Sequence, residues 1–186
     1  SWIGYGPSIQ PIGGLVHLWD YPEEGPPAGS GSIFPDHLAG RLLAVVALAG
    51  LIRRSRTGHG GHGSVAQAEA VVNILGDQML QEDLEPGSAI PRGNRSERGA
   101  PWGSYPCEGV EEWIAITIRD DADWQRLRTA MGDPEWAKAE SYAHEAGRFA
   151  AHDEIDRRLG EWTRSQSVQA LVTTLQMFNV PAAPMY

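Results

Sequence analysis

The chain has 186 residues, of which 41% are hydrophobic and 21% are charged, and this composition is typical of a soluble globular protein with one or two domains. A net charge of −9 disfavours a nucleic-acid partner. The only cysteine, Cys107, excludes an internal disulfide and favours a reducing, cytoplasmic compartment. The apolar run from Leu42 to Ile52 is flanked by arginines and is shorter than the roughly 18 residues of a membrane span, so we expect no membrane association.

The first third of the chain predicts helices separated by turns. Glycine and proline are frequent before Asp36, with a short helix expected near Ser8–Leu18. From Asp36 to Arg54 apolar residues cover most of a helical surface, which predicts a helix buried nearly all round. Gly58 is suited to end that helix in the left-handed conformation, and another helix is expected from Val65 to Gln81.

The remaining chain predicts a loop followed by a small mixed unit. Residues 82–106 are rich in Gly, Pro, Ser and Arg, which indicates a linker or a flap over a substrate. A β-hairpin follows, with Ile114, Ile116 and Ile118 on one face of its second strand. After it we expect a helix capped by Asp121, helices at His152–Thr163 and Ser167–Phe178, and an edge strand after Val180.

Asp36 is the residue most suited to chemistry, because it stands where a loop becomes a helix. A helix start has unpaired N–H groups and a positive dipole end, so a carboxylate there serves either as a cap or as a nucleophile. Gly29, Gly31 and Pro35 shape the approach to it, and Gly40 follows one turn later on the same face. The residues themselves leave both roles open.

Other chemical candidates are weaker. His59 and His62 lie three residues apart, but no further ligand is near them in sequence, so we expect a turn and no metal site. Cys107 is followed by Glu108, and we expect a buried, unreactive thiol.

Three blocks in this order resemble the class III CoA-transferases, the carnitine dehydratase and bile-acid-inducible F family. They are GSIFPDHLAGRLLAVVALAGLIRRSRTGHGGHGSVAQAEAVVN, then NRSERGAPWGSYPCEGVEEWIAI, then LQMFNVPAAPM. The resemblance implies an α/β fold, here an excerpt of a two-domain protein. Residues 1–84 would be the C-terminal part of the large Rossmann-like domain, residues 85–104 a glycine-containing linker and residues 105–186 a small α+β domain.

The resemblance also implies a function and a set of site residues. Asp36 falls on the catalytic aspartate, which moves CoA between carboxylic acids through an aspartyl-CoA thioester. Tyr5 and Gln10 fall in a loop over the active site, and Gln67 falls at a CoA contact. Gly93 and Asn94 match part of a glycine-rich flap, but the glycine run after them is replaced by RSERGAP, which disfavours an oxalate or formate substrate.

The same resemblance sets the expected partners and one alternative. Acyl-CoA and an acceptor acid would be the substrates, with no permanent cofactor and no metal, and the full-length protein would form an interlocked homodimer. The α-methylacyl-CoA racemases share the scaffold and carry Gly-His-Asp where this chain has Gly4-Tyr5-Gly6. The loss of His and Asp argues against racemase chemistry, while a non-catalytic fragment with Asp36 as a simple cap is the third possibility.

Overall fold

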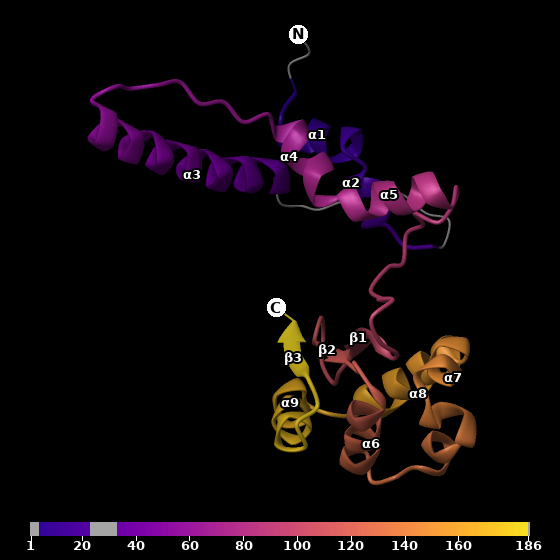
Figure 1. Ribbon diagram of the computed structural model, residues 1–186. Coiled ribbons are helices and arrows are strands. Elements are labelled where there is room, and N and C mark those ends of the chain that lie inside the picture. Colours follow the sequence, from indigo (N-terminus) through magenta and orange to yellow (C-terminus); the bar gives the residue numbers. More distant parts are fainter. Residues whose placement is uncertain (1–3, 23–32, 186) are drawn as a thin grey trace. The chain divides into compact units, whose positions relative to one another are not determined.

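The structure is a computed structural model that describes residues 4–22 and 33–185 (Figure 1). The chain divides into two units, unit 1 (Ser1–Gly93) and unit 2 (Asn94–Tyr186). Each unit has its own buried apolar residues, and each is described by itself below. The mixed helical and strand content confirms the predicted α/β class.

The described part of unit 1 is helical. Its elements are α1 (Gly6–Ile12), α2 (Leu15–Leu18), α3 (Phe34–Thr57), α4 (Gln67–Ile74) and α5 (Gly76–Leu84). The helix α1 contacts α2, α3 and α4, and α4 also contacts α3 (Figure 1). Leu15, Ala39, Ala70 and Val71 are buried where these helices meet. This small cluster holds the first turns of α3 and α4 next to each other.

The helix α3 begins and ends with residues suited to those positions. It starts at Phe34, two residues before the predicted start, and Pro35 lies in its first turn, where a missing N–H costs nothing. Gly58 ends it with φ of 73°, and the Gly58 N–H donates to the carbonyl of Arg54 at 2.8 Å. The predicted C-terminal glycine is therefore confirmed.

The prediction that α3 is buried nearly all round is wrong for this chain. Its buried residues are Pro35 and Ala39, and six large apolar side chains farther along are exposed: Leu42, Leu43, Val45, Leu48, Leu51 and Ile52. The neighbouring helices cover only the start of α3, and farther along only the segment 60–63 approaches it, next to Val46, so most of its apolar pattern stays exposed in the described residues. By length and apolar composition α3 could also cross a membrane, but core helices of soluble proteins meet the same criterion.

The segment predicted as one helix from Val65 to Gln81 is two helices in the structure. The break is at Leu75, which leaves helical geometry with φ of −99° and ψ of 13° and is followed by Gly76. Glycine is a weak helix former, which explains why the interruption occurs there.

Unit 2 combines a three-stranded antiparallel sheet with helices. The strands are β1 (Trp102–Pro106), β2 (Trp113–Thr117) and β3 (Ala182–Met185), and β2 lies in the middle. The helical elements are α6 (Asp121–Ala130), η1 (Glu135–Lys138), η2 (Glu140–Ala143), α7 (Glu145–Ala150), α8 (His152–Thr163) and α9 (Val168–Met177). The predicted hairpin, the bounds of α8 and the edge position of the last strand are confirmed.

One face of the sheet in unit 2 packs on a continuous apolar core. Ile114, Ile116 and Ile118 are fully buried, whereas Trp113 on the other face is 39% exposed. They meet Trp124, Leu127, Ile155, Leu159, Leu171 and Leu175 from α6, α8 and α9. The cap of α6 is Asp120, whose carboxylate accepts from the Asp123 N–H at 2.7 Å, so the predicted cap at Asp121 is off by one residue.

Candidate functional site

Asp36 is the third residue of α3 and does not cap it. The residue before the helix is Ile33, and no side chain caps this end. The Asp36 carboxylate instead faces α4, where Gln67 Nε2 donates a hydrogen bond to Asp36 Oδ1 at 3.1 Å. The reading of Asp36 as a simple cap is therefore wrong, because its side chain bonds across to another helix.

The second carboxylate oxygen of Asp36 is buried and has no hydrogen-bond partner within the described residues. Buried carboxylate oxygens nearly always accept a hydrogen bond, because burial removes their hydrogen bonds to water and leaving these unreplaced costs free energy. An oxygen in this state keeps its full capacity to accept a hydrogen bond or to form a bond with a group that reaches it. The two oxygens of Asp36 are thus different, because one is hydrogen-bonded and the other is unpaired.

Gly6 makes this arrangement possible. It is the first residue of α1, and a Cβ added there would lie 1.8 Å from Asp36 Oδ2 and 3.0 Å from Cγ. No side chain fits at position 6 while the carboxylate keeps its place. Farther along α3, a Cβ at Gly40 would meet nothing within 4 Å, so the space expected there is open.

The other predicted site residues have different surroundings. Tyr5 directly precedes Gly6, is 78% exposed, and its carbonyl accepts from the N–H groups of Ser8 and Ile9. Gln10 lies in α1 and is buried, with 4% of its surface exposed. Gln10 lies within α1 and Tyr5 just before it, and α1 contacts the helices that carry Asp36 and Gln67.

Gly93 and Asn94 fall on the division between the units. Gly93 is the last residue of unit 1, has φ of 58° and donates its N–H to the carbonyl of Asp20 at 3.0 Å. Asn94 is the first residue of unit 2. The predicted site residues are thus divided between the two units, and Gly29 and Gly31 lie outside the described residues.

Sequence reasoning did not assign Gly6 a structural role. In the sequence, Gly6 was notable only because the racemases have Asp at the aligned position. The signal for its role was weak, because a glycine before a helix is usually explained by backbone freedom. The close approach to Asp36 arises from residues far apart in the chain.

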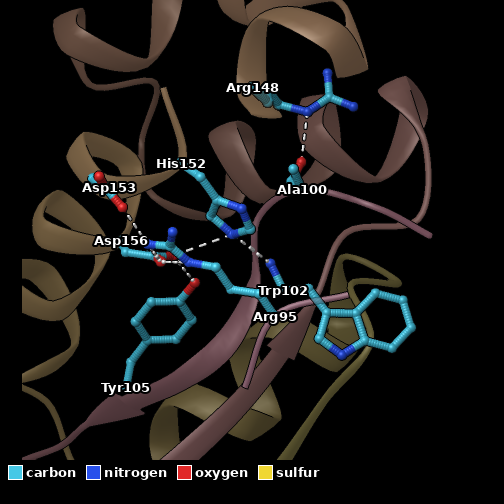
Figure 2. A network of polar contacts seen from close by, with 8 residues as sticks. All are labelled: Arg95, Ala100, Trp102, Tyr105, Arg148, His152, Asp153 and Asp156. Atoms are coloured by element: carbon cyan, nitrogen blue, oxygen red, sulfur yellow. Dashed lines mark hydrogen bonds and ion pairs between the residues drawn. The ribbon is translucent and has the colours of Figure 1, made fainter. Parts of the chain in front are cut away.

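A second cluster of polar side chains lies in unit 2 and joins β1 and the segment before it to α8 (Figure 2). Asp156 accepts hydrogen bonds from Tyr105 Oη at 2.7 Å and from Arg95 Nη2 at 2.7 Å. Arg95 Nη2 also pairs with Asp153 at 2.6 Å. Burial, followed by the charge of Asp156, raises the pKa of Tyr105 well above 10, so Tyr105 stays protonated and donates.

The same segment is held at two further points (Figure 2). The Trp102 N–H donates to Nε2 of the buried His152 at 3.3 Å, and the fully buried Arg148 donates to the carbonyl of Ala100 at 2.7 Å. Burial lowers the pKa of His152, which keeps Nε2 free to accept. These contacts hold residues 95–102 against the rest of unit 2, although the sequence predicted them as part of a linker. The polar cluster thus serves to fix this segment.

Cys107 is buried, as predicted, and burial, together with the charge of Glu112, raises its pKa. A thiol with a raised pKa is a poor nucleophile at neutral pH. Cys107 is thus part of the core of unit 2.

Comparisons with known proteins agree with the resemblance seen in the sequence. The family model of CoA-transferase family III matches residues 1–186. A probable CoA-transferase of Mycobacterium tuberculosis, Rv1866, is 32% identical over 98% of this chain and 24% of its own length. The succinyl-CoA–D-citramalate CoA-transferase of Chloroflexus aurantiacus is 29% identical over 98% of this chain and 45% of its own length.

Solved structures give the same result. A CaiB/BaiF family protein from Brucella suis superimposes with a TM-score of 0.84 at 27% identity, over 98% of this chain and 48% of the other. A hypothetical protein of Mycobacterium tuberculosis, Rv3272, has the same fold, with a TM-score of 0.76 at 21% identity, over 98% of this chain and 48% of its own. The chain spans less than half the length of these relatives. With its full length matched by the family model, the chain belongs to CoA-transferase family III.

Proposed function

We propose that the protein containing this chain moves CoA from an acyl-CoA to a carboxylic acid, with Asp36 as the nucleophile. The observation that carries the proposal is the buried, unpaired Oδ2 of Asp36 beside a glycine that leaves room for it. Family membership supports the reaction class, and the relatives' names include succinyl-CoA–D-citramalate and formyl-CoA:oxalate CoA-transferases.

The reaction proceeds in balanced acyl-transfer steps. Oδ2 attacks the thioester carbonyl, and the C–S bond breaks as CoA departs as a thiolate. The product is a mixed anhydride between Asp36 and the donor acyl group. The thiolate then attacks Cγ of Asp36 and releases the donor acid, which leaves an aspartyl-CoA thioester. An acceptor carboxylate reverses these steps and departs as its CoA thioester. A carboxylate nucleophile suits this exchange because each intermediate is activated, so one difficult transfer becomes several easier ones.

The racemase alternative is disfavoured by Gly6. The racemases carry an acidic residue at the aligned position, but any Cβ there would lie 1.8 Å from Asp36 Oδ2 in this chain. Tyr5, the residue aligned with their histidine, has no imidazole to move an α-proton. The geometry thus supports transferase chemistry over α-proton exchange.

The remaining assignments are part of the same proposal. Tyr5, Gln10, Gly93 and Asn94 would contact the substrates, and the full-length protein would be a cytoplasmic homodimer without a permanent cofactor. These assignments rest on the family resemblance and on the placement of Tyr5 just before α1 and of Gln10 within α1, the helix that contacts α3 and α4.

Covalent trapping in the full-length parent protein tests the proposal. We expect incubation with a panel of acyl-CoAs, followed by hydroxylamine, to place a hydroxamate on the peptide that contains Asp36, as read by mass spectrometry. The Asp36→Asn variant should give neither hydroxamate nor transfer. Asp77→Asn is the matched control, because Asp77 lies in the first turn of α5 and bonds only its neighbour's N–H in the described structure. Deuterium exchange at the α-carbon without hydroxamate would instead establish racemase chemistry.

A further inference from the structure

Gln67 is the one described side chain with a hydrogen bond to the Asp36 carboxylate, and it comes from a helix fixed in the core of unit 1. It is the first residue of α4, and its Nε2 lies 3.1 Å from Asp36 Oδ1 in a partly buried contact. Three and four residues later, Ala70 and Val71 are buried and anchor the helix. The amide is therefore presented by a rigid element, as an effective donor in a catalytic site must be.

The contact makes the two carboxylate oxygens chemically different. Oδ1 is held by the Gln67 amide, while Oδ2 is buried and unpaired in the described structure. The held oxygen loses part of its nucleophilicity to the hydrogen bond, so Oδ2 is the oxygen that attacks the thioester. Once Oδ2 is acylated, Oδ1 is the carbonyl oxygen of the anhydride and later of the aspartyl-CoA thioester.

Negative charge then develops on Oδ1. When CoA sulfur attacks Cγ, a C–S bond forms and the electron pair of the C=O bond moves onto Oδ1. The pair returns as the Cγ–Oδ2 bond breaks, and the donor carboxylate leaves with Oδ2. Attack by the acceptor carboxylate on the thioester places charge on Oδ1 again, with thiolate as the leaving group. A hydrogen-bond donor at Oδ1 serves both steps.

We propose that Gln67 is this donor: it orients Asp36 so that Oδ2 attacks, and it stabilises the oxyanion on Oδ1 when Cγ is attacked. The inference rests on the proposed function and gives Gln67 a role different from the CoA contact implied by the family resemblance. A CoA contact alone would affect binding, whereas an oxyanion donor affects the chemical step.

The first test is Gln67→Met in the full-length protein, with the acyl-CoA and acid that the trapping experiment identifies. Methionine has nearly the same length and shape but no N–H. We expect kcat to fall about 100-fold and KM for acyl-CoA to change by less than about threefold. Gln78→Met, in α5, is the matched control and should retain wild-type kinetics. A raised KM with unchanged kcat would overturn the inference in favour of a CoA contact.

The second test is Gln67→Glu, which gives a signature that a purely structural role does not. The introduced carboxyl group donates to Oδ1 only while it is protonated, and Asp36 attacks only while it is ionised. Activity should therefore peak in the pH range where the pair shares one proton, and it should fall on both sides. A pH profile parallel to that of the wild type would overturn the inference.

The outcomes separate this inference from the proposed function. If Asp36→Asn abolishes transfer while Gln67→Met keeps the wild-type kcat, the transferase stands and the role of Gln67 is wrong. If Asp36→Asn retains transfer and no hydroxamate forms on Asp36, both are wrong. Circular dichroism and thermal melting of each variant show whether a loss of activity reflects unfolding.

Discussion

Unit 1 and unit 2 differ in how far their apolar side chains are buried. In unit 2 the apolar side chains of α6, α8 and α9 point to one sheet face and are buried with it. In unit 1 the longest helix, α3, leaves most of its apolar side chains exposed, with Val45 63% and Leu48 60% exposed. Unit 2 closes its own core, whereas unit 1 closes only the small cluster that carries Asp36.

The difference explains where the chemistry lies. Asp36 and Gln67 lie at the starts of α3 and α4, which is the part of unit 1 that is packed. The exposed remainder of α3 contributes nothing to that contact. Exposed apolar surface of this extent is typical of an interaction site, so we expect the exposed face of α3 to be covered by another polypeptide segment.

The largest expected effect comes from separating the units. Residues 94–186 should unfold in one cooperative urea transition, because their core is complete. Residues 1–93 should show no cooperative transition, since α3 has too little to pack against. Far-ultraviolet circular dichroism of the two fragments measures both, and a cooperative transition in residues 1–93 would contradict the comparison.

A glycine in unit 2 should be the most sensitive single position. A Cβ at Gly147 would lie 1.6 Å from the backbone oxygen of Ser141, so Gly147→Ala must displace backbone and should cost about 3 kcal/mol or more. Gly160→Ala is the control. Gly160 lies within α8, and a Cβ there would come no closer than 4.0 Å to the side chain of Pro106. It should be neutral or stabilise by up to about 1 kcal/mol, as urea unfolding would show.

Two leucines compare the helices directly. Leu159 is fully buried, and Leu159→Ala should destabilise unit 2 by about 3 kcal/mol. Leu48 is 60% exposed, and Leu48→Ala in this chain should change the unfolding free energy by less than about 0.5 kcal/mol. A large loss at Leu48, together with a concentration-dependent melting temperature, would mean that a second copy already covers α3.

The smallest expected effect is a pH dependence in unit 2. Burial lowers the folded-state pKa of His152 below 6.5, although Asp156 nearby opposes the shift. The unfolded chain then binds a proton more readily, so the unfolding free energy should fall as the pH drops below 6.5 towards the folded pKa. His152→Gln should remove this component, whereas the exposed His62→Gln should leave it. Equal pH slopes in wild type and His152→Gln would contradict this assignment.

Local patterns predicted the parts of the fold that depend on near neighbours. Gly58 at the end of α3 and the alternation of Ile114, Ile116 and Ile118 reflect backbone geometry and period alone, and both are confirmed. The break at Leu75 was missed, because a single glycine after apolar residues does not reliably end a helix. The exposure of α3 was missed because an apolar pattern indicates burial without naming what covers it.

The sequence by itself determined the family, the α/β class and Asp36 as the residue to test, since these follow from short motifs in a set order. Only the tertiary structure decided what Asp36 contacts. It brought Gln67, 31 positions away, to one oxygen and placed Gly6, which has no side chain, beside the other. Such contacts depend on how α1, α3 and α4 pack together, and helix packing is fixed by side-chain fit across the chain, which no local pattern records.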